Sequence, residues 1–168
     1  MKLIATRITA VFVLAAVPLF AVAHEGDALG KKTGKKAEPT EHAANLGEPG
    51  KVADATRTVE VRMTDAMRFE PSSIAATKGE TIRFLVRNEG KLKHEMVLGT
   101  EKELKEHAAL MQKFPNMQHA DPNMVSLEPG TSGEMVWHFT KAGKFDFACL
   151  QPGHMEAGMK GKIDVAAK

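Results

Sequence analysis

The stretch Cys149-Leu-Gln-Pro-Gly-His154-Met-Glu-Ala-Gly-Met159 carries three side chains that bind soft metals. Cys149 is the only cysteine of the chain, and four residues separate each of the three from the next. A thiolate, an imidazole and a thioether on one short loop are the ligand types that favour copper over magnesium or calcium. The stretch therefore predicts a copper site.

Predicted strands fix both ends of this loop. One strand covers residues 144–149 and the next begins at Gly161. Within the loop, the Pro-Gly pair at 152–153 predicts a turn that directs His154 back toward the cysteine. Because both ends are held, three side chains of the loop can converge on one point.

A trigonal copper site also requires a second imidazole from elsewhere in the chain. His94 begins the apolar run His94-Glu-Met-Val-Leu, far upstream of the loop. We therefore predict a mononuclear type 1 copper site formed by His94, Cys149, His154 and Met159, in which the Met159 thioether is the weak axial ligand.

The chain around these residues is patterned as strands. Short segments rich in β-branched and aromatic residues alternate with turns such as Glu128-Pro-Gly130 and Lys141-Ala-Gly143. The predicted strands cover residues 58–63, 69–74 (interrupted by Pro71), 81–88, 94–98, 133–140, 144–149 and 161–165. This spacing indicates an all-β fold, an antiparallel β-sandwich with one core and one domain over residues 57–168.

One helix interrupts the strand pattern. Thr100 and Glu103 form a capping box at its start. Leu104, Ala108 and Met111 follow at helical spacing and predict one buried face. We therefore expect one short inserted helix.

The N-terminal segment is expected to lie outside the domain. Residues 1–23 combine early basic residues, a short apolar run and a small-x-small site, so we expect a signal peptide that is cleaved after Ala23. This leaves 168 − 23 = 145 residues and predicts that the protein is exported. Residues 24–56 are polar without periodicity and predict a flexible arm.

Charge and cysteine content narrow the function further. The signal holds two of the 23 basic residues, so the mature chain carries 21 basic and 21 acidic side chains. This balance gives no reason to expect binding to nucleic acid, nor to a membrane after cleavage. A single cysteine in an exported protein cannot form an internal disulfide, and metal binding would protect its thiol.

The ligand pattern resembles the cupredoxins, the blue-copper protein family. The resemblance rests on three features: Cys149 at a strand end preceded by Phe145 and Phe147, a following His and Met on one loop, and a distant upstream His. More narrowly, His24-Glu-Gly, His94-Glu-Met and Cys149-Leu-Gln-Pro-Gly-His154 resemble the CopI-type periplasmic copper-tolerance cupredoxins. The resemblance implies a Greek-key β-sandwich and one type 1 copper.

One position departs from the family pattern. Many cupredoxins place Asn directly after the upstream His, whereas this chain has Glu95. A carboxylate there would change the hydrogen bonds around the ligands and could shift the colour and potential of the site. Glu95 is also an alternative axial ligand to Met159.

Further weak copper sites are hypotheses at this stage. The α-amino group and imidazole of His24, with His42, could chelate copper on the arm. Met111, Met117, His119 and Met124 cluster around a loop and could bind Cu(I).

Two functions compete. The first is copper tolerance or handling in the periplasm with one-electron redox activity, and the alternative is a dedicated soluble electron carrier without a role in copper resistance. Either protein would be a monomer that exchanges electrons with a redox partner such as a cytochrome. An enzyme is not expected, because the chain has no paired His-x-His motifs for a trinuclear centre and too few cysteines for a binuclear one.

Overall fold

A computed structural model describes residues 46–115 and 120–168 of the chain. The expected signal peptide, the arm up to residue 45 with His24 and His42, and the loop residues Met117 and His119 lie outside the described residues. The structure therefore bears on the predicted domain and on the four predicted copper ligands.

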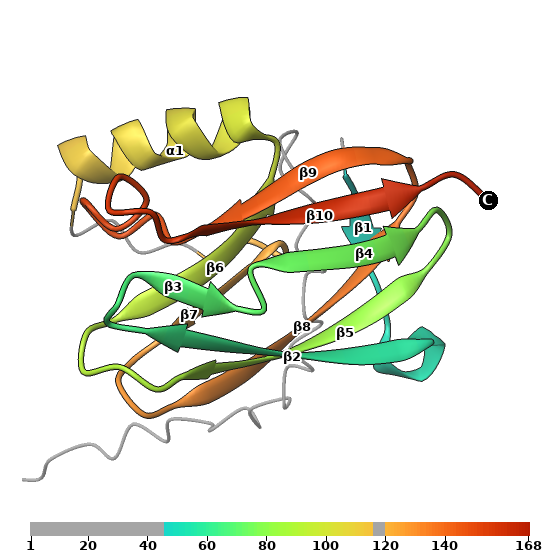
Figure 1. Ribbon diagram of the computed structural model, residues 1–168, viewed down its shortest axis with the longest axis horizontal. Coiled ribbons are helices and arrows are strands. Elements are labelled where there is room, and N and C mark those ends of the chain that lie inside the picture. Colours follow the sequence, from blue (N-terminus) through green and yellow to red (C-terminus); the bar gives the residue numbers. More distant parts are fainter. Residues whose placement is uncertain (1–45, 116–119) are drawn as a thin grey trace, which may run out of the picture. The chain divides into compact units, whose positions relative to one another are not determined.

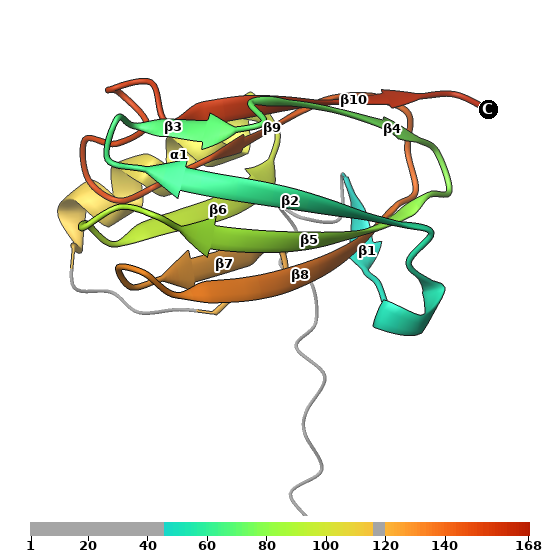
Figure 2. The same cartoon turned by 60° about the horizontal axis from the view of Figure 1, so that its bottom comes forward.

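The described residues form two five-stranded sheets (Figures 1 and 2). The first sheet has the order β1 (Gly47–Pro49), β8 (Ser132–Phe139), β5 (Thr81–Asn88), β2 (Arg57–Thr64) and β3 (Arg68–Glu70). The second has the order β4 (Ser73–Thr77), β10 (Lys160–Ala166), β9 (Gly143–Ala148), β6 (His94–Gly99) and β7 (Met124–Leu127). The expected all-β sandwich is confirmed.

Alternation of buried and exposed residues explains why these segments face each other. In β10, for example, Gly161, Ile163 and Val165 are buried, while the residues between them are exposed. Such a period of two puts one face of a strand into the core and leaves the other in solvent. One core cluster between the sheets contains Trp137, Phe84 and Phe147, all with 0% exposure.

The expectation that all strand pairs are antiparallel is wrong for two pairs. β2 pairs with β5 in parallel, and β4 pairs with β10 in parallel. The chain leaves the first sheet after β3, crosses at Pro71 into β4 of the second sheet, and returns in β5. This crossing allows β5 to run beside β2 in the same direction, because a direct hairpin no longer connects them.

The inserted helix α1 (Glu101–Lys113) forms as predicted. Thr100 and Glu103 make the reciprocal capping box, and Leu104, Ala108 and Met111 are the buried face. These residues pack with Val97, Ala148 and Leu150, so α1 lies against β6 and β9 of the second sheet (Figure 1). No helix among the described residues combines the length and the apolarity that a membrane crossing requires.

Two strands were not predicted from the sequence. Leu46 is fully buried and β1 pairs with β8, so the sheet begins before the boundary at residue 57 that composition suggested. The three residues Gly47–Pro49 are too few for a periodic signal. β7 pairs with β6 and buries Val125 and Leu127 on either side of Ser126, an alternation that the sequence does contain.

Candidate metal centre

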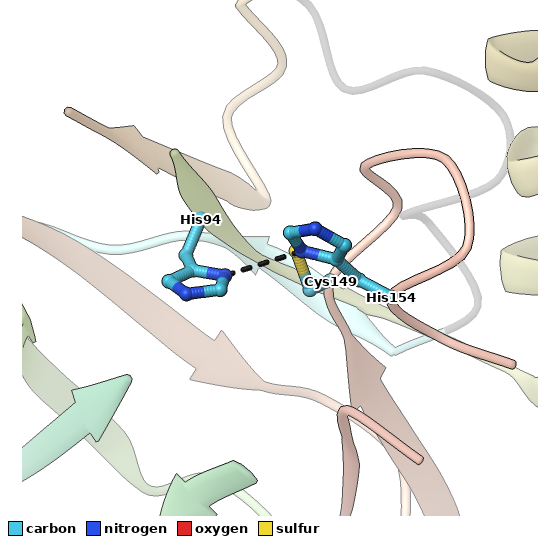
Figure 3. Close-up of side chains that lie close together, drawn as sticks. All are labelled: His94, Cys149 and His154. Atoms are coloured by element: carbon cyan, nitrogen blue, oxygen red, sulfur yellow. Dashed lines mark hydrogen bonds between the residues drawn. The ribbon is translucent and has the colours of Figure 1, made fainter. Parts of the chain in front are cut away.

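Three of the four predicted ligands lie close together (Figure 3). His94 is the first residue of β6, Cys149 directly follows β9, and His154 lies in the loop after it. One donor atom from each of the three lies within 4.8 Å of the other two. His94 and Cys149, which are 149 − 94 = 55 positions apart in the chain, are thus close together because β6 and β9 are paired strands.

The donor separations suit a small metal ion. His94 Nδ1 lies 3.2 Å from His154 Nδ1, and Cys149 Sγ lies 3.3 Å from His154 Nδ1. In a trigonal plane around a first-row metal, two nitrogens at about 2.0 Å from the metal would be about 3.5 Å apart, and a sulfur at about 2.3 Å would lie about 3.7 Å from each nitrogen, so both observed separations are within about 0.5 Å of these values. Two imidazoles and one thiolate at this spacing fit a type 1 copper.

Cys149 is held in the core rather than on the surface. Its side chain is fully buried, and its backbone N–H donates to the carbonyl of Met159 at 3.1 Å. The Glu95 N–H points at its sulfur at 3.4 Å. Burial raises the pKa of the Cys149 thiol to about 12, so at neutral pH a metal must displace its proton.

Tight turns bring His154 back toward Cys149. Gly153 and Gly158 have φ values of 84° and 100°, a region that residues with a side chain rarely adopt. The His154 N–H donates to the Gln151 carbonyl, and the Met159 N–H donates to the His154 carbonyl, each at 3.0 Å. The predicted turn at residues 152–153 and the second bend are therefore present.

Met159 ends the loop and directly precedes β10. Its side chain is fully buried and belongs to the same core cluster as Cys149. A backbone hydrogen bond from Cys149 to Met159 closes the loop, so the backbone of the fourth predicted ligand lies beside that of Cys149. Its assignment as the axial ligand stays a prediction.

His94 is fixed by a carboxylate that the sequence analysis did not identify. His94 has 0% side-chain exposure, and its Nε2 lies 3.0 Å from Oδ1 of Asp65, in the turn between β2 and β3. Asp65 also accepts the N–H groups of Lys91 and Leu92. These hydrogen bonds, chiefly that from Lys91 and then that from His94, lower the pKa of Asp65.

Glu95 connects the two ligand-bearing segments. It has 2% exposure, and its Oε1 accepts the Leu150 N–H while its Oε2 accepts the Gln151 side-chain amide, each at 3.1 Å. Both oxygens thus contact donors of the loop that follows Cys149. This geometry favours a role for Glu95 in linking the two segments by hydrogen bonds, over the role of axial ligand that the sequence left open.

His154 is the more accessible of the two imidazoles. Its exposure is intermediate, and the neighbouring Pro152 and Gly153 are exposed. Partial burial, and next the adjacent His94 ring, lower the pKa of His154. A lower pKa keeps the ring neutral at neutral pH, which is the form that binds a metal.

The proposed second soft-metal site is only partly within the described residues. Met111 is buried against the sheet in the core cluster under α1, and Met124 packs against the same cluster. Both thioethers therefore have a packing role in the described structure. A role in Cu(I) binding together with Met117 and His119 stays a hypothesis.

The chain is similar to known copper-binding proteins over most of its length. A sequence profile of copper binding proteins, plastocyanin/azurin family, matches residues 55–166. A copper-resistant cuproprotein CopI of Rubrivivax gelatinosus is 49% identical over 161 residues, which cover 95% of this chain and 98% of that protein. A second CopI, from Pseudomonas aeruginosa, is 37% identical over 153 residues, covering 74% of this chain and 84% of that protein.

Solved structures agree on the fold. The reduced auracyanin of Roseiflexus castenholzii superposes with a TM-score of 0.58 at 22% identity, covering 67% of this chain and 98% of the auracyanin. Auracyanin B gives a TM-score of 0.59 at 24% identity, covering 72% of this chain and 96% of its own. The resemblance predicted from the ligand stretch is confirmed, and copper is the metal that this centre fits.

Proposed function

The chain belongs to the plastocyanin/azurin family of copper-binding proteins, and from this premise we propose that it is a periplasmic copper-tolerance protein with a one-electron redox centre. The proposed ligands are His94, Cys149, His154 and Met159. The observation that carries the proposal is the convergence of His94, Cys149 and His154 within 4.8 Å around a buried thiol.

The protein's contribution is to hold the donors in place before a metal arrives. Copper, when bound, would supply a centre that gains and loses one electron. Cys149 is fixed by backbone hydrogen bonds to and from its neighbours, His94 by Asp65, and the loop by Glu95. Donors that do not move between oxidation states keep the reorganisation on electron transfer small.

His154 gives the centre its contact with a redox partner. It lies at an exposed turn, whereas His94 and Cys149 are fully buried. An electron that enters or leaves through the His154 edge needs no substrate pocket, only a brief encounter with another protein. Small and weak interfaces are typical of such encounters.

The tolerance role draws on the relatives. The CopI of R. gelatinosus is named a copper-resistant cuproprotein and matches nearly the whole of this chain. Export belongs to the proposal as well: a signal peptide over residues 1–23 would be removed after Ala23, and an N-terminal arm would precede the copper domain. Redox-active copper in that compartment would let the protein bind copper ions and change their oxidation state.

The alternative is a dedicated electron carrier. It uses the same centre, so spectra alone do not separate the two functions. Catalysis on an organic substrate is not part of either, because the only cysteine of the chain and both histidines of the centre are committed to the metal in this proposal.

Spectroscopy of the copper-loaded protein tests the centre. We expect an intense thiolate-to-copper absorption band and an electron paramagnetic resonance signal of type 1 copper at one copper per chain. A wild-type protein that binds copper without the band would overturn the ligand set.

Growth on copper tests the biological role. A deletion strain should lose copper tolerance, and the wild-type gene should restore it whereas a gene encoding Cys149→Ser should not. Normal tolerance of the deletion strain would favour the electron carrier.

A further inference from the structure

The carboxylate of Asp65 makes three hydrogen bonds beside the centre. Its Oδ1 lies 3.0 Å from His94 Nε2 and accepts the Leu92 N–H at 3.2 Å. Its Oδ2 accepts the Lys91 N–H at 2.7 Å. Asp65 lies in the turn between β2 and β3 of the first sheet, whereas His94 begins β6 of the second, so this contact joins the two sheets.

The loop between β5 and β6, which contains Gly90, packs closely against the Asp65–His94 pair. A Cβ added at Gly90 would lie 2.0 Å from Asp65 Oδ1 and 3.1 Å from His94 Nε2, so only glycine fits against them. The Gly90 N–H donates to the side chain of Asn88, whose amide in turn donates to the carbonyls of Leu92 and Leu127. The loop therefore keeps the carboxylate aimed at the ring.

An acceptor at Nε2 decides which nitrogen faces the metal. When Nε2–H donates to Asp65, the proton is on Nε2 and the Nδ1 lone pair is available to a metal. Nδ1 is the nitrogen that lies 3.2 Å from His154 Nδ1. A negative charge on the far side of the ring also makes the imidazole a stronger donor.

We propose that Asp65 is a positioning residue of the copper centre, which fixes the tautomer of His94 and stabilises Cu(II) relative to Cu(I). The proposal rests on the proposed function, because it takes His94 as a ligand. The physical reason is that a nearby anion and a more basic ligand favour the more highly charged ion. Asp65 therefore lowers the reduction potential.

Asp65→Asn in the full chain is the first test, since it removes the charge and retains an oxygen acceptor. We expect Cu(II) affinity to fall by about 10–100-fold, and Cu(I) affinity to fall by about tenfold less. That difference raises the reduction potential by about 59 mV, the value of a tenfold change for one electron. Affinities and potential are measured separately and must agree through this relation.

Glu89→Gln is the matched control. Glu89 is exposed on the same loop, where it lies 3.9 Å from both Arg62 and Arg87, and its replacement removes the same charge. The reduction potential of the Glu89→Gln variant should stay near that of the wild type. Equal shifts in Asp65→Asn and Glu89→Gln would overturn the positioning role, because they would reduce it to a general charge effect.

Gly90→Ala supplies a second variant if Asp65→Asn does not fold. It displaces the carboxylate from His94 without changing any charge. We expect a rise in potential of the same sign, and faster exchange of the His94 Nε2–H in nuclear magnetic resonance spectra of the Cu(I) form. The inference is refuted if the variants fold, show the thiolate band and have the same reduction potential as the wild type. If the wild type itself lacks the band, the proposed ligand set is wrong instead.

Discussion

His94 and His154 bring equivalent nitrogens to within 3.2 Å of each other, but the protein holds the two rings differently. His94 is fully buried, and a carboxylate from the opposite sheet fixes its far nitrogen. His154 is half-exposed and is positioned by turns within its own loop. One imidazole is therefore positioned by the stacking of the sheets and the other by local chain geometry.

The largest effect is expected from replacing Cys149, the predicted thiolate ligand of the site that both histidines line. Cys149→Ser should abolish the intense absorption band and lower Cu(II) affinity by more than the roughly 100-fold loss that changing an outer partner can cause. The reason is that serine supplies no thiolate. Copper titration followed by absorption checks this, and circular dichroism of the apo protein shows whether the fold is retained. A persistent band would mean that Cys149 is not the thiolate ligand.

Replacing each histidine by glycine tests the comparison itself. External imidazole should restore the band in His154→Gly, because that position reaches solvent. In His94→Gly the concentration needed should be at least about tenfold higher, since entry requires local opening and each 1.4 kcal/mol of opening adds about a factor of ten. Titration of both variants with imidazole measures the difference. Equal concentrations would break the distinction between a fixed and an accessible ring.

The pH dependence of copper binding identifies the group that carries the displaced proton. Because burial raises the pKa of Cys149 to about 12, the free thiol is protonated at neutral pH and copper binding releases its proton. Cu(II) affinity should therefore increase with pH, by about tenfold per unit from about pH 7 to about pH 9. Competition titrations across this range measure the slope. A flat profile would show that the thiol is already ionised in the folded protein.

The smallest effect is expected from replacing Glu95, which links the start of β6 to the loop after Cys149 through hydrogen bonds. Glu95→Ala leaves the Leu150 N–H without its acceptor, and should lower the free energy of unfolding by about 1–3 kcal/mol. Glu95→Gln retains an acceptor oxygen and should cost less. Denaturant unfolding of the apo protein measures both, with the exposed strand residue Glu60→Ala as a control expected within about 0.5 kcal/mol. If Glu95→Ala matched the control, Glu95 would not hold the loop.

Much of the fold was predictable because its signals are local. The capping box at Thr100, the strand over residues 81–88 and the break at Pro71 were read from neighbouring residues and are present in the structure. β1 and the parallel pairing of β2 with β5 were not predictable in this way. Three residues carry no period, and pairing direction depends on where the chain crosses between sheets.

The candidate site divides along the same line. The spacing of Cys149, His154 and Met159 predicted a copper loop, and the structure places His94 beside it through the pairing of β6 with β9. Glu95 departs from the family pattern in the sequence, but its hydrogen bonds to Leu150 and Gln151 depend on the tertiary structure. Asp65 carried no signal, because a single aspartate in a turn is common.

The sequence by itself determined which metal-binding side chain types the loop carries, their order along it and the sandwich of strands that supports them. These follow from side-chain chemistry and from periodicities over a few residues. The tertiary structure decided that Asp65, 29 residues before His94, contacts its ring, and that His94 is buried while His154 is accessible. Such contacts depend on how two sheets stack, and stacking is a property of the whole core rather than of any short segment.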